Sequence, residues 1–153
     1  MRPLRFELAS EFATAPFKGS KDSAGIDLAS AENLLIPSGE RDLVSTGVAF
    51  QLPLDTYGKL EPRSGLAARY GVHVEGAYVG DNGEKILAGI IDCDYTGVVA
   101  VVLLNTGEHD FKICRGDRIA QMIVKSYVPT HLIEVDNIND TERGEDGFGS
   151  TGK

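Results

Sequence analysis

The sequence predicts an all-β protein, a jelly-roll-like barrel or sandwich of short strands with a mobile glycine-rich C-terminal arm. Ten short segments carry alternating or continuous apolar residues and are bounded by Gly, Pro, Asn or Asp. Because so many short strands follow one another within 153 residues, a barrel or a sandwich is the expected architecture. After about Val135 the chain becomes polar and rich in glycine. We therefore expect one β-barrel domain at residues 1–135 and an arm at residues 136–153.

The individual elements follow from local patterns. A helix is predicted at Ser64–Tyr70, because helix-forming residues follow Ser64 and Gly71 stands where a left-handed residue closes a helix. We find no internal repeat and no linker. The expected strands are Arg5–Leu8, Gly25–Ala29, Asn33–Ile36, Val44–Gln51, Tyr57–Glu61, Val72–Val79, Lys85–Ile91, Val98–Asn105, Asp110–Ile113 and Gln121–Tyr127.

Composition and charge limit the classes of partner. The formal net charge of −8 argues against general nucleic-acid binding, which needs a basic face. The most apolar run, Val98–Leu104, is too short to cross a bilayer, and Met1–Phe6 lacks the apolar core of a signal peptide. We therefore expect a soluble intracellular protein, cytoplasmic or nuclear, that binds neither membranes nor nucleic acid. Cys93 and Cys114 lack metal-ligand spacing, and we interpret both as reduced structural residues.

The C-terminal segment Arg143–Lys153 offers groups that suit a nucleoside polyphosphate. Its dense glycines disfavour a stable helix or strand, because glycine loses the most backbone freedom on ordering. The segment carries a guanidinium, two hydroxyls, one aromatic ring and several unobstructed backbone N–H groups. Taken alone, it is equally compatible with a disordered solubilising tail.

Two segments in the first half of the chain place charged residues beside apolar strands. In Ala24–Leu28, Asp27 is an acid inside an otherwise apolar strand. In Glu61–Ala67, Pro62 stops a strand, and the cation Arg63 and a hydroxyl follow at the start of a helical turn. A helix start presents free N–H groups, so this turn suits a phosphate group; an ordinary capped turn is the alternative.

Two segments in the second half carry isolated polar residues. In Ala88–Gly97, Asp92 follows an apolar pair and precedes Tyr95. This run is either a plain hairpin turn or a carboxylate at the base of a pocket with a tyrosine ring as its wall. In Gly116–Met122, Gln121 is a polar residue that enters an apolar strand.

These four segments and the arm, in this order, resemble the five motifs of the trimeric all-β dUTPase family, from Ala24 to Gly152. The resemblance implies hydrolysis of dUTP to dUMP and pyrophosphate, which keeps uracil out of DNA and supplies the precursor of thymidylate. It implies Mg²⁺ as cofactor, held mainly by the three phosphates and by water. It also implies a homotrimer in which three chains assemble each active site, so that residues 1–135 would be the catalytic domain and residues 136–153 an arm that closes over a site.

The resemblance assigns roles within the third motif. Asp92 matches the general base that activates the water attacking the α-phosphorus. Tyr95 matches the ring packed against the deoxyribose, which leaves no room for a 2′-hydroxyl. Backbone groups around residues 87–90 match the hairpin that reads the uracil edge, with Gly89, Ile90 and Ile91 as substrate-binding positions.

The first, second and fourth motifs match groups around the phosphates and the metal. Gln121 matches a catalytic polar contact to the phosphate chain. Asp27 matches an acid near the water shell of the metal, acting at most in the outer sphere, and a structural role is an equal alternative. The turn that contacts the phosphates matches Arg63, Ser64, Gly65 and Leu66.

The arm matches the lid of the family. Phe148 would stack on the uracil ring, and Arg143 would hold the γ-phosphate as a catalytic cation. Because such an arm orders on binding, it can shed water from the site. The remaining contacts to the γ-phosphate match Gly149, Ser150 and Thr151.

One stretch departs from the family pattern. About twelve extra residues, Glu75–Ile86, precede Leu87, where family members run almost directly into the third motif. Within them Gly80–Gly83 is a strong turn signal, so we expect an extended hairpin that projects beyond the uracil-reading strands. A tolerated surface insertion is one interpretation; a contact between subunits or a surface for a partner is the other.

Three other functions stay open at this point. A relative acting on dCTP would share the fold, although the Arg63 turn and the Asp92–Tyr95 run favour dUTP. A nucleotide-binding regulator could signal without turnover, but Asp92, Arg143 and Phe148 argue against a dead scaffold. A structural trimer without a ligand would leave the order of five polar motifs unexplained.

Overall fold

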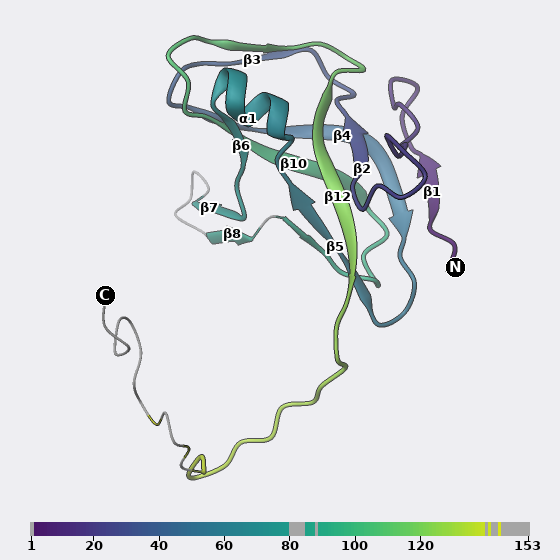
Figure 1. Cartoon of the computed structure of the whole chain (residues 1–153), viewed down its shortest axis with the longest axis vertical. Coiled ribbons are helices and arrows are strands. Elements are labelled where there is room, and N and C mark those ends of the chain that lie inside the picture. Colours follow the sequence, from purple (N-terminus) through teal and green to yellow (C-terminus); the bar gives the residue numbers. More distant parts are fainter. Residues whose placement is uncertain (1, 80–84, 88, 140, 142–143, 145–153) are drawn as a thin grey trace.

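The computed structural model describes residues 2–79, 85–87, 89–139, 141 and 144. Within them the chain is antiparallel β structure with one short helix (Figure 1), so the all-β class is confirmed. The elements are β1 (Arg5–Leu8), β2 (Ile26–Ala29), β3 (Leu34–Ile36), β4 (Arg41–Gln51), β5 (Thr56–Glu61), α1 (Ser64–Tyr70), β6 (Val72–Val74), β7 (Ala77–Val79), β8 (Lys85–Leu87), β9 (Ile90–Ile91), β10 (Val98–Asn105), β11 (Phe111–Ile113) and β12 (Arg118–Ser126).

Two four-stranded sheets and two strand pairs make up the described part of the fold. One large sheet has the order β1-β4-β10-β6 and the other β2-β12-β5-β9, while β11 pairs with β3 and β7 with β8. Buried and half-buried residues alternate along β5, as expected of a strand with one face on the core. Apolar side chains from both large sheets form one buried cluster, which includes Leu28, Val44, Leu60, Val101, Leu103 and Met122.

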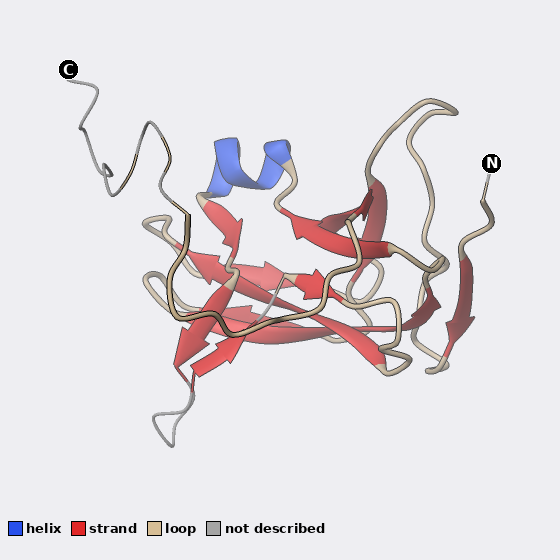
Figure 2. Ribbon diagram, turned by 90° about the horizontal axis from the view of Figure 1, so that it is seen from below, coloured by secondary structure: helices blue, strands red, loops and turns tan. Residues whose placement is uncertain are grey.

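Helix α1 lies outside the strand body (Figure 2) and has the predicted bounds. It ends at Gly71, whose φ of 67° is the left-handed conformation that closes a helix. The cap residue at its start is Arg63, so Ser64 is the first helical residue. No helical residue is fully buried, and the ring of Tyr70 contacts that of Phe111 with centroids 5.5 Å apart.

Two of the expected strands are each divided in the structure. Residues 72–79 form β6, which pairs with β10, and β7, which pairs with β8. Residues 85–91 form β8 and β9, separated at Gly89, whose φ of 90° interrupts the extended backbone. The sequence pattern missed both breaks because apolar alternation does not show where a strand changes its partner.

Strands β7 and β8 form the hairpin expected from the inserted residues. Ala77 pairs with Leu87, and Val79 pairs with Lys85. The predicted turn at Gly80–Gly83 lies outside the described residues.

After β12 the described chain has no helix or strand. Strand β12 ends at Ser126, and the chain then leaves the strand body (Figure 1). Leu132 and Ile138 are 99% and 89% exposed. The division between domain and arm at residue 135 stays a prediction. In the part of the chain that the structure describes, no helix is long and apolar enough to cross a membrane.

Candidate active site

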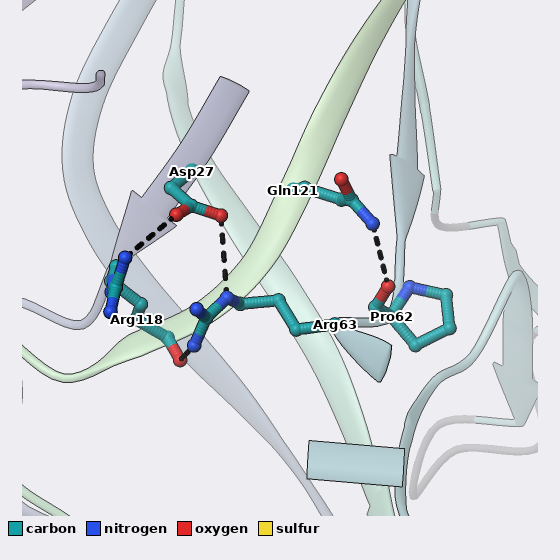
Figure 3. A network of polar contacts seen from close by, with 5 residues as sticks. All are labelled: Asp27, Pro62, Arg63, Arg118 and Gln121. Carbon is teal, nitrogen blue, oxygen red and sulfur yellow. Dashed lines mark hydrogen bonds and ion pairs between the residues drawn. The ribbon is translucent and has the colours of Figure 1, made fainter. Parts of the chain in front are cut away.

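Three motifs meet at the end of one sheet, where Asp27 holds two arginines (Figure 3). Strand β2 carries Asp27 beside Gln121 of β12, and Gln121 pairs with Glu61 at the end of β5. The Asp27 Oδ1 atom lies 3.3 Å from Arg63 Nε, and Oδ2 lies 3.2 Å from Arg118 Nη1. Two guanidinium groups on one carboxylate leave a net positive charge at this place, as a phosphate-binding site requires.

A further hydrogen bond fixes the Arg63 guanidinium. Its Nη1 atom donates to the backbone carbonyl of Arg118 at 3.1 Å. The Asp27 and Arg63 side chains are 16% and 26% exposed, so this ion pair is partly shielded from solvent. Arg118, on the fourth motif, is a residue that the sequence interpretation did not single out; no spacing signal pairs it with Asp27, 91 positions away.

The side chain of Gln121 lies between the backbone of Pro62 and that of Gly25. Its Nε2 atom donates to the carbonyl of Pro62 at 3.0 Å, which ties β12 to the turn that carries Arg63 (Figure 3). On the other side, a Cβ atom added to Gly25 would lie 2.0 Å from Gln121 Oε1. Only a glycine at position 25 leaves room for this carboxamide.

The Arg63 side chain lines a pocket of about 570 Å³, which we name the Arg63 pocket. Three cations, Arg63, Lys112 and Arg118, and two acids line it together with Leu66. Ser64 and Gly65 are exposed at the start of α1 and are not among its lining residues. The pocket therefore contains two of the four expected phosphate-turn residues.

The residues of the third motif line a second, more apolar pocket of about 320 Å³, which we name the Asp92 pocket. Asp92 is exposed at this pocket, and its carboxylate has no hydrogen-bond or ion-pair partner in the described part of the chain. The Asp92 carbonyl accepts from the N–H of Tyr95 at 3.1 Å, which closes a turn between them. The lining residues are Leu43, Gly89, Ile90, Ile91, Asp92, Tyr95, Val98, Val99, Ala100 and Val102.

Strand β9 anchors the Asp92 pocket to the sheet. Its residues pair with β5, and the Gly89 carbonyl accepts from the N–H of Leu60 at 2.8 Å. The φ of 90° at Gly89 is a conformation that side chains rarely adopt, so the backbone here depends on glycine. Ile90 is 53% exposed and offers an apolar surface at the pocket. Ala88, part of the predicted uracil-reading backbone, lies outside the described residues.

The two pockets share no lining residue. Strand β5 lies between β9 and β12 in its sheet. Ile91 of β9 pairs with Gly58 of β5, and Gln121 of β12 pairs with Glu61, three residues further along β5. This places Ile91 and Gln121 about 10 Å apart along the strand and about 10 Å apart across it. Within one chain, the candidate base and the candidate phosphate-binding cations therefore belong to separate places.

A side-chain contact joins the third motif to Tyr127, the residue that follows β12. The Tyr127 hydroxyl lies 3.9 Å from Cys93 Sγ, and Cys93 follows Asp92 directly. The hydrogen bond to Cys93, and then the negative charge of its thiolate form, raise the pKa of Tyr127 above its ordinary value of 10.0. The Tyr127 hydroxyl therefore stays protonated at neutral pH, and either group can donate in this contact. Cys93 and Cys114 are both free, in agreement with the sequence.

A family profile described as dUTPase matches residues 11–152. The chain belongs to the dUTPase family. A deoxyuridine 5′-triphosphate nucleotidohydrolase of Paramecium bursaria Chlorella virus 1 is 44% identical over 142 residues, which cover 93% of this chain and 92% of that protein. A mutant Staphylococcus bacteriophage 80alpha dUTPase, solved with dUpNHpp, is 25% identical with a TM-score of 0.83, and the match covers 100% of both chains. A mutant dUTPase of phage phi11 of S. aureus, solved with a structural Mg(II) ion, shares the fold at 23% identity and a TM-score of 0.74, covering 89% of this chain and 98% of that one.

Of the five dUTPase motifs, the structure brings three together and leaves the third in its own pocket. Asp27 of the first motif and Arg63 of the second form an ion pair, and Gln121 of the fourth motif binds the carbonyl of Pro62, next to Arg63 (Figure 3). The predicted arm residues of the fifth motif lie outside the described residues: Arg143, Phe148, Gly149, Ser150 and Thr151.

Proposed function

We propose that this chain hydrolyses dUTP to dUMP and pyrophosphate in the cytoplasm or nucleus, with Asp92 as the general base. The observation that carries the proposal is the exposed Asp92 carboxylate at an apolar pocket, in a chain of the dUTPase family. By removing dUTP the enzyme keeps uracil out of DNA, and its product dUMP feeds thymidylate synthesis.

Hydrolysis at the α-phosphorus requires a free carboxylate close to the nucleotide. A carboxylate with no bound cation keeps its lone pairs for a water molecule, whose proton it accepts as the water attacks the α-phosphorus. Aliphatic side chains of Ile90, Ile91 and Val102 in the same pocket suit a flat pyrimidine ring. The Tyr95 ring in that pocket would pack on the deoxyribose and leave no room for a 2′-hydroxyl.

The phosphates would bind beside Arg63, at the edge of the Arg63 pocket and along the turn at the start of α1. Arg63 supplies the guanidinium, and Gln121 and the exposed Ser64 and Gly65 of the same turn supply further donors. Asp27 is already occupied by two arginines, which supports a structural role for it: the carboxylate sets the position of Arg63. We assign Asp27 this role in place of an outer-sphere contact to a metal.

The residues of the site fit a Mg²⁺ ion that the substrate and water hold. No group of three or more His, Cys, Asp or Glu side chains that could hold a metal ion occurs among the described residues. Both Asp27 carboxylate oxygens bind arginines, so the chain offers no preformed cage at that place. Mg²⁺ usually keeps several waters and binds through substrate phosphates, and when bound it offsets their negative charge.

We further propose a homotrimer with shared active sites. The Asp92 pocket and the Arg63 pocket share no lining residue, which supports a site that takes the two pockets from different chains. The exposed apolar residues after β12, such as Leu132 and Ile138, agree with a C-terminal segment that packs on another subunit. The arm at residues 136–153 would then close a site to which two other chains contribute.

Pyrophosphate release with Mg²⁺ present tests the proposed reaction. We expect rapid release from dUTP and at least about 100-fold slower release from dCTP, dTTP and UTP, because each differs where the site makes contact. Faster release from dCTP would assign the chain to the related dCTP enzymes. Tight dUTP binding without release would favour a regulatory nucleotide-binding protein.

A further inference from the structure

We propose that Gly97 is a positioning residue that sets the sugar specificity of the site by holding the ring of Tyr95 in place. The inference rests on the proposed function, because it concerns the discrimination between dUTP and UTP. Gly97 was not a predicted site residue, and it is not among the residues that line the Asp92 pocket. Its effect would be exerted through Tyr95 alone.

The ring of Tyr95 lies directly against the Gly97 backbone. A Cβ atom built on Gly97 would lie 2.5 Å from the Tyr95 hydroxyl oxygen, 2.7 Å from Cζ and 3.0 Å from Cε2. Contacts this short do not occur in folded proteins, so no side chain fits at position 97 while the ring keeps its place. The glycine therefore provides the surface on which the ring rests.

One hydrogen bond completes the support of the ring. The Tyr95 hydroxyl donates to the carbonyl of Val98, the residue after Gly97, at 3.0 Å. Tyr95 is nevertheless 46% exposed, so little other packing holds it. A methyl group at position 97 would lift the ring and break the bond to Val98. The wall beside the sugar would then lose its fixed position.

The backbone of Gly97 does not itself require glycine. Its φ lies outside the left-handed range, in contrast to Gly89 at 90° and Gly116 at 86°. Alanine at position 97 therefore meets no left-handed backbone strain, and its effect reports on the Tyr95 ring. This difference makes Gly97→Ala a clean probe of the contact.

The test compares the full-length protein with Gly97→Ala, Tyr95→Ala and the double variant, by kcat/KM for dUTP and for UTP. Gly97→Ala should reduce the dUTP-to-UTP preference by about 10-fold, as overpacking at a single contact does. In the Tyr95→Ala background the same substitution should change the preference by less than about 2-fold, because the colliding ring is absent. The melting temperature should fall in Gly97→Ala and recover in the double variant.

A matched control is Gly19→Ala, which adds the same methyl group where the nearest atom is Ser23 Oγ at 3.9 Å. It should change neither the preference nor the melting temperature. The inference is overturned if Gly97→Ala leaves the preference unchanged, lowers both activities equally, or acts with full strength without the Tyr95 ring. A wild-type protein that shows no preference for dUTP would instead overturn the proposed function, and the specificity role of Gly97 with it.

Discussion

Asp27, on strand β2, forms an ion pair with Arg63, the cap residue of helix α1, with 3.3 Å between Oδ1 and Nε. The other carboxylate oxygen of Asp27 binds Arg118. The carboxylate therefore orients one arginine and neutralises part of the charge of two. Since Arg63 also donates to the Arg118 carbonyl, its guanidinium is held before a substrate arrives. Such preorganisation lowers the entropy cost of binding a phosphate.

Asp27→Asn should weaken substrate binding while leaving the fold intact. The amide keeps the shape but loses the charge, so Arg63 is no longer held by an ion pair. We expect kcat/KM for dUTP to fall about 10- to 100-fold, mainly through KM, because a hydrogen bond to a charged group is worth about 1.5–3 kcal/mol. Steady-state kinetics and thermal melting check this. Asp22→Asn, in an exposed turn, is the control, and equal kinetics for both variants would contradict the role of Asp27.

Asp92→Asn should abolish most turnover without loss of the fold or of dUTP affinity. The substitution removes only the proton acceptor, and a general base typically contributes about 10²–10⁴ in rate. Single-turnover pyrophosphate release and dUTP titration give the two quantities separately. Asp94→Asn is a matched control, since Asp94 is an exposed carboxylate two positions away that does not line the Asp92 pocket. Near-normal turnover in Asp92→Asn would remove Asp92 from its role.

Deletion of residues 143–153 should leave a folded protein that binds dUMP but hydrolyses dUTP poorly. The deleted arm would contribute the Arg143 cation and the Phe148 ring, while the buried apolar residues of the described part of the chain lie between Leu28 and Met122. We expect kcat/KM for dUTP to fall about 100-fold or more, as for the loss of a positioned charge donor, with the dUMP affinity nearly unchanged. Calorimetry and kinetics measure these values. A truncated protein that fails to fold would show that the arm is structural.

Removal of the inserted hairpin, residues 77–87, should leave an active enzyme. The two ends of the hairpin already lie together: a Cβ atom on Gly89 would be 3.5 Å from the Cα atom of Gly76. Gly76 and Gly89 therefore already lie side by side, so a join across the deletion needs little movement of the body. The deletion must spare Glu75, because its carboxylate binds Arg41 at 2.8 Å.

For this deletion we expect activity within about 3-fold of the parent and a modestly lower melting temperature, because a short two-stranded hairpin contributes mainly local contacts. Light scattering provides the control on assembly. Loss of the oligomer would show that β7 and β8 belong to a subunit interface, and the interpretation as a surface insertion would then be wrong.

Local signals in the sequence predicted the elements with strong local causes. Helix α1 ends at Gly71 because a left-handed glycine closes it, and the run Val98–Asn105 forms β10 with the predicted bounds. The breaks at β6–β7 and β8–β9 were missed because they arise from a change of pairing partner and from the φ of Gly89. No local pattern records either cause.

The residues of the candidate site could be predicted from the sequence, but not all of their contacts. The family resemblance named Asp27 and Arg63, and the structure joins them. It did not indicate the contact of Arg118 with Asp27 or that of Tyr127 with Cys93. The residues of these two contacts lie 91 and 34 positions apart in the chain. Such contacts depend on strand register and on turns far apart in the sequence, so they become visible only in three dimensions.

The sharing of one active site between chains is tested most directly by mixing two inactive variants. Asp92→Asn lacks the base and Arg63→Ala lacks the phosphate-binding cation, and each alone should release almost no pyrophosphate from dUTP. If every site takes Asp92 from one chain and Arg63 from another, random refolding of an equal mixture makes about half times half, or about a quarter, of the sites intact. Mass spectrometry of the assembled oligomers verifies the mixing. Activity near a quarter of the wild-type value is the predicted result; mixed oligomers no more active than the two variants alone would contradict a shared site.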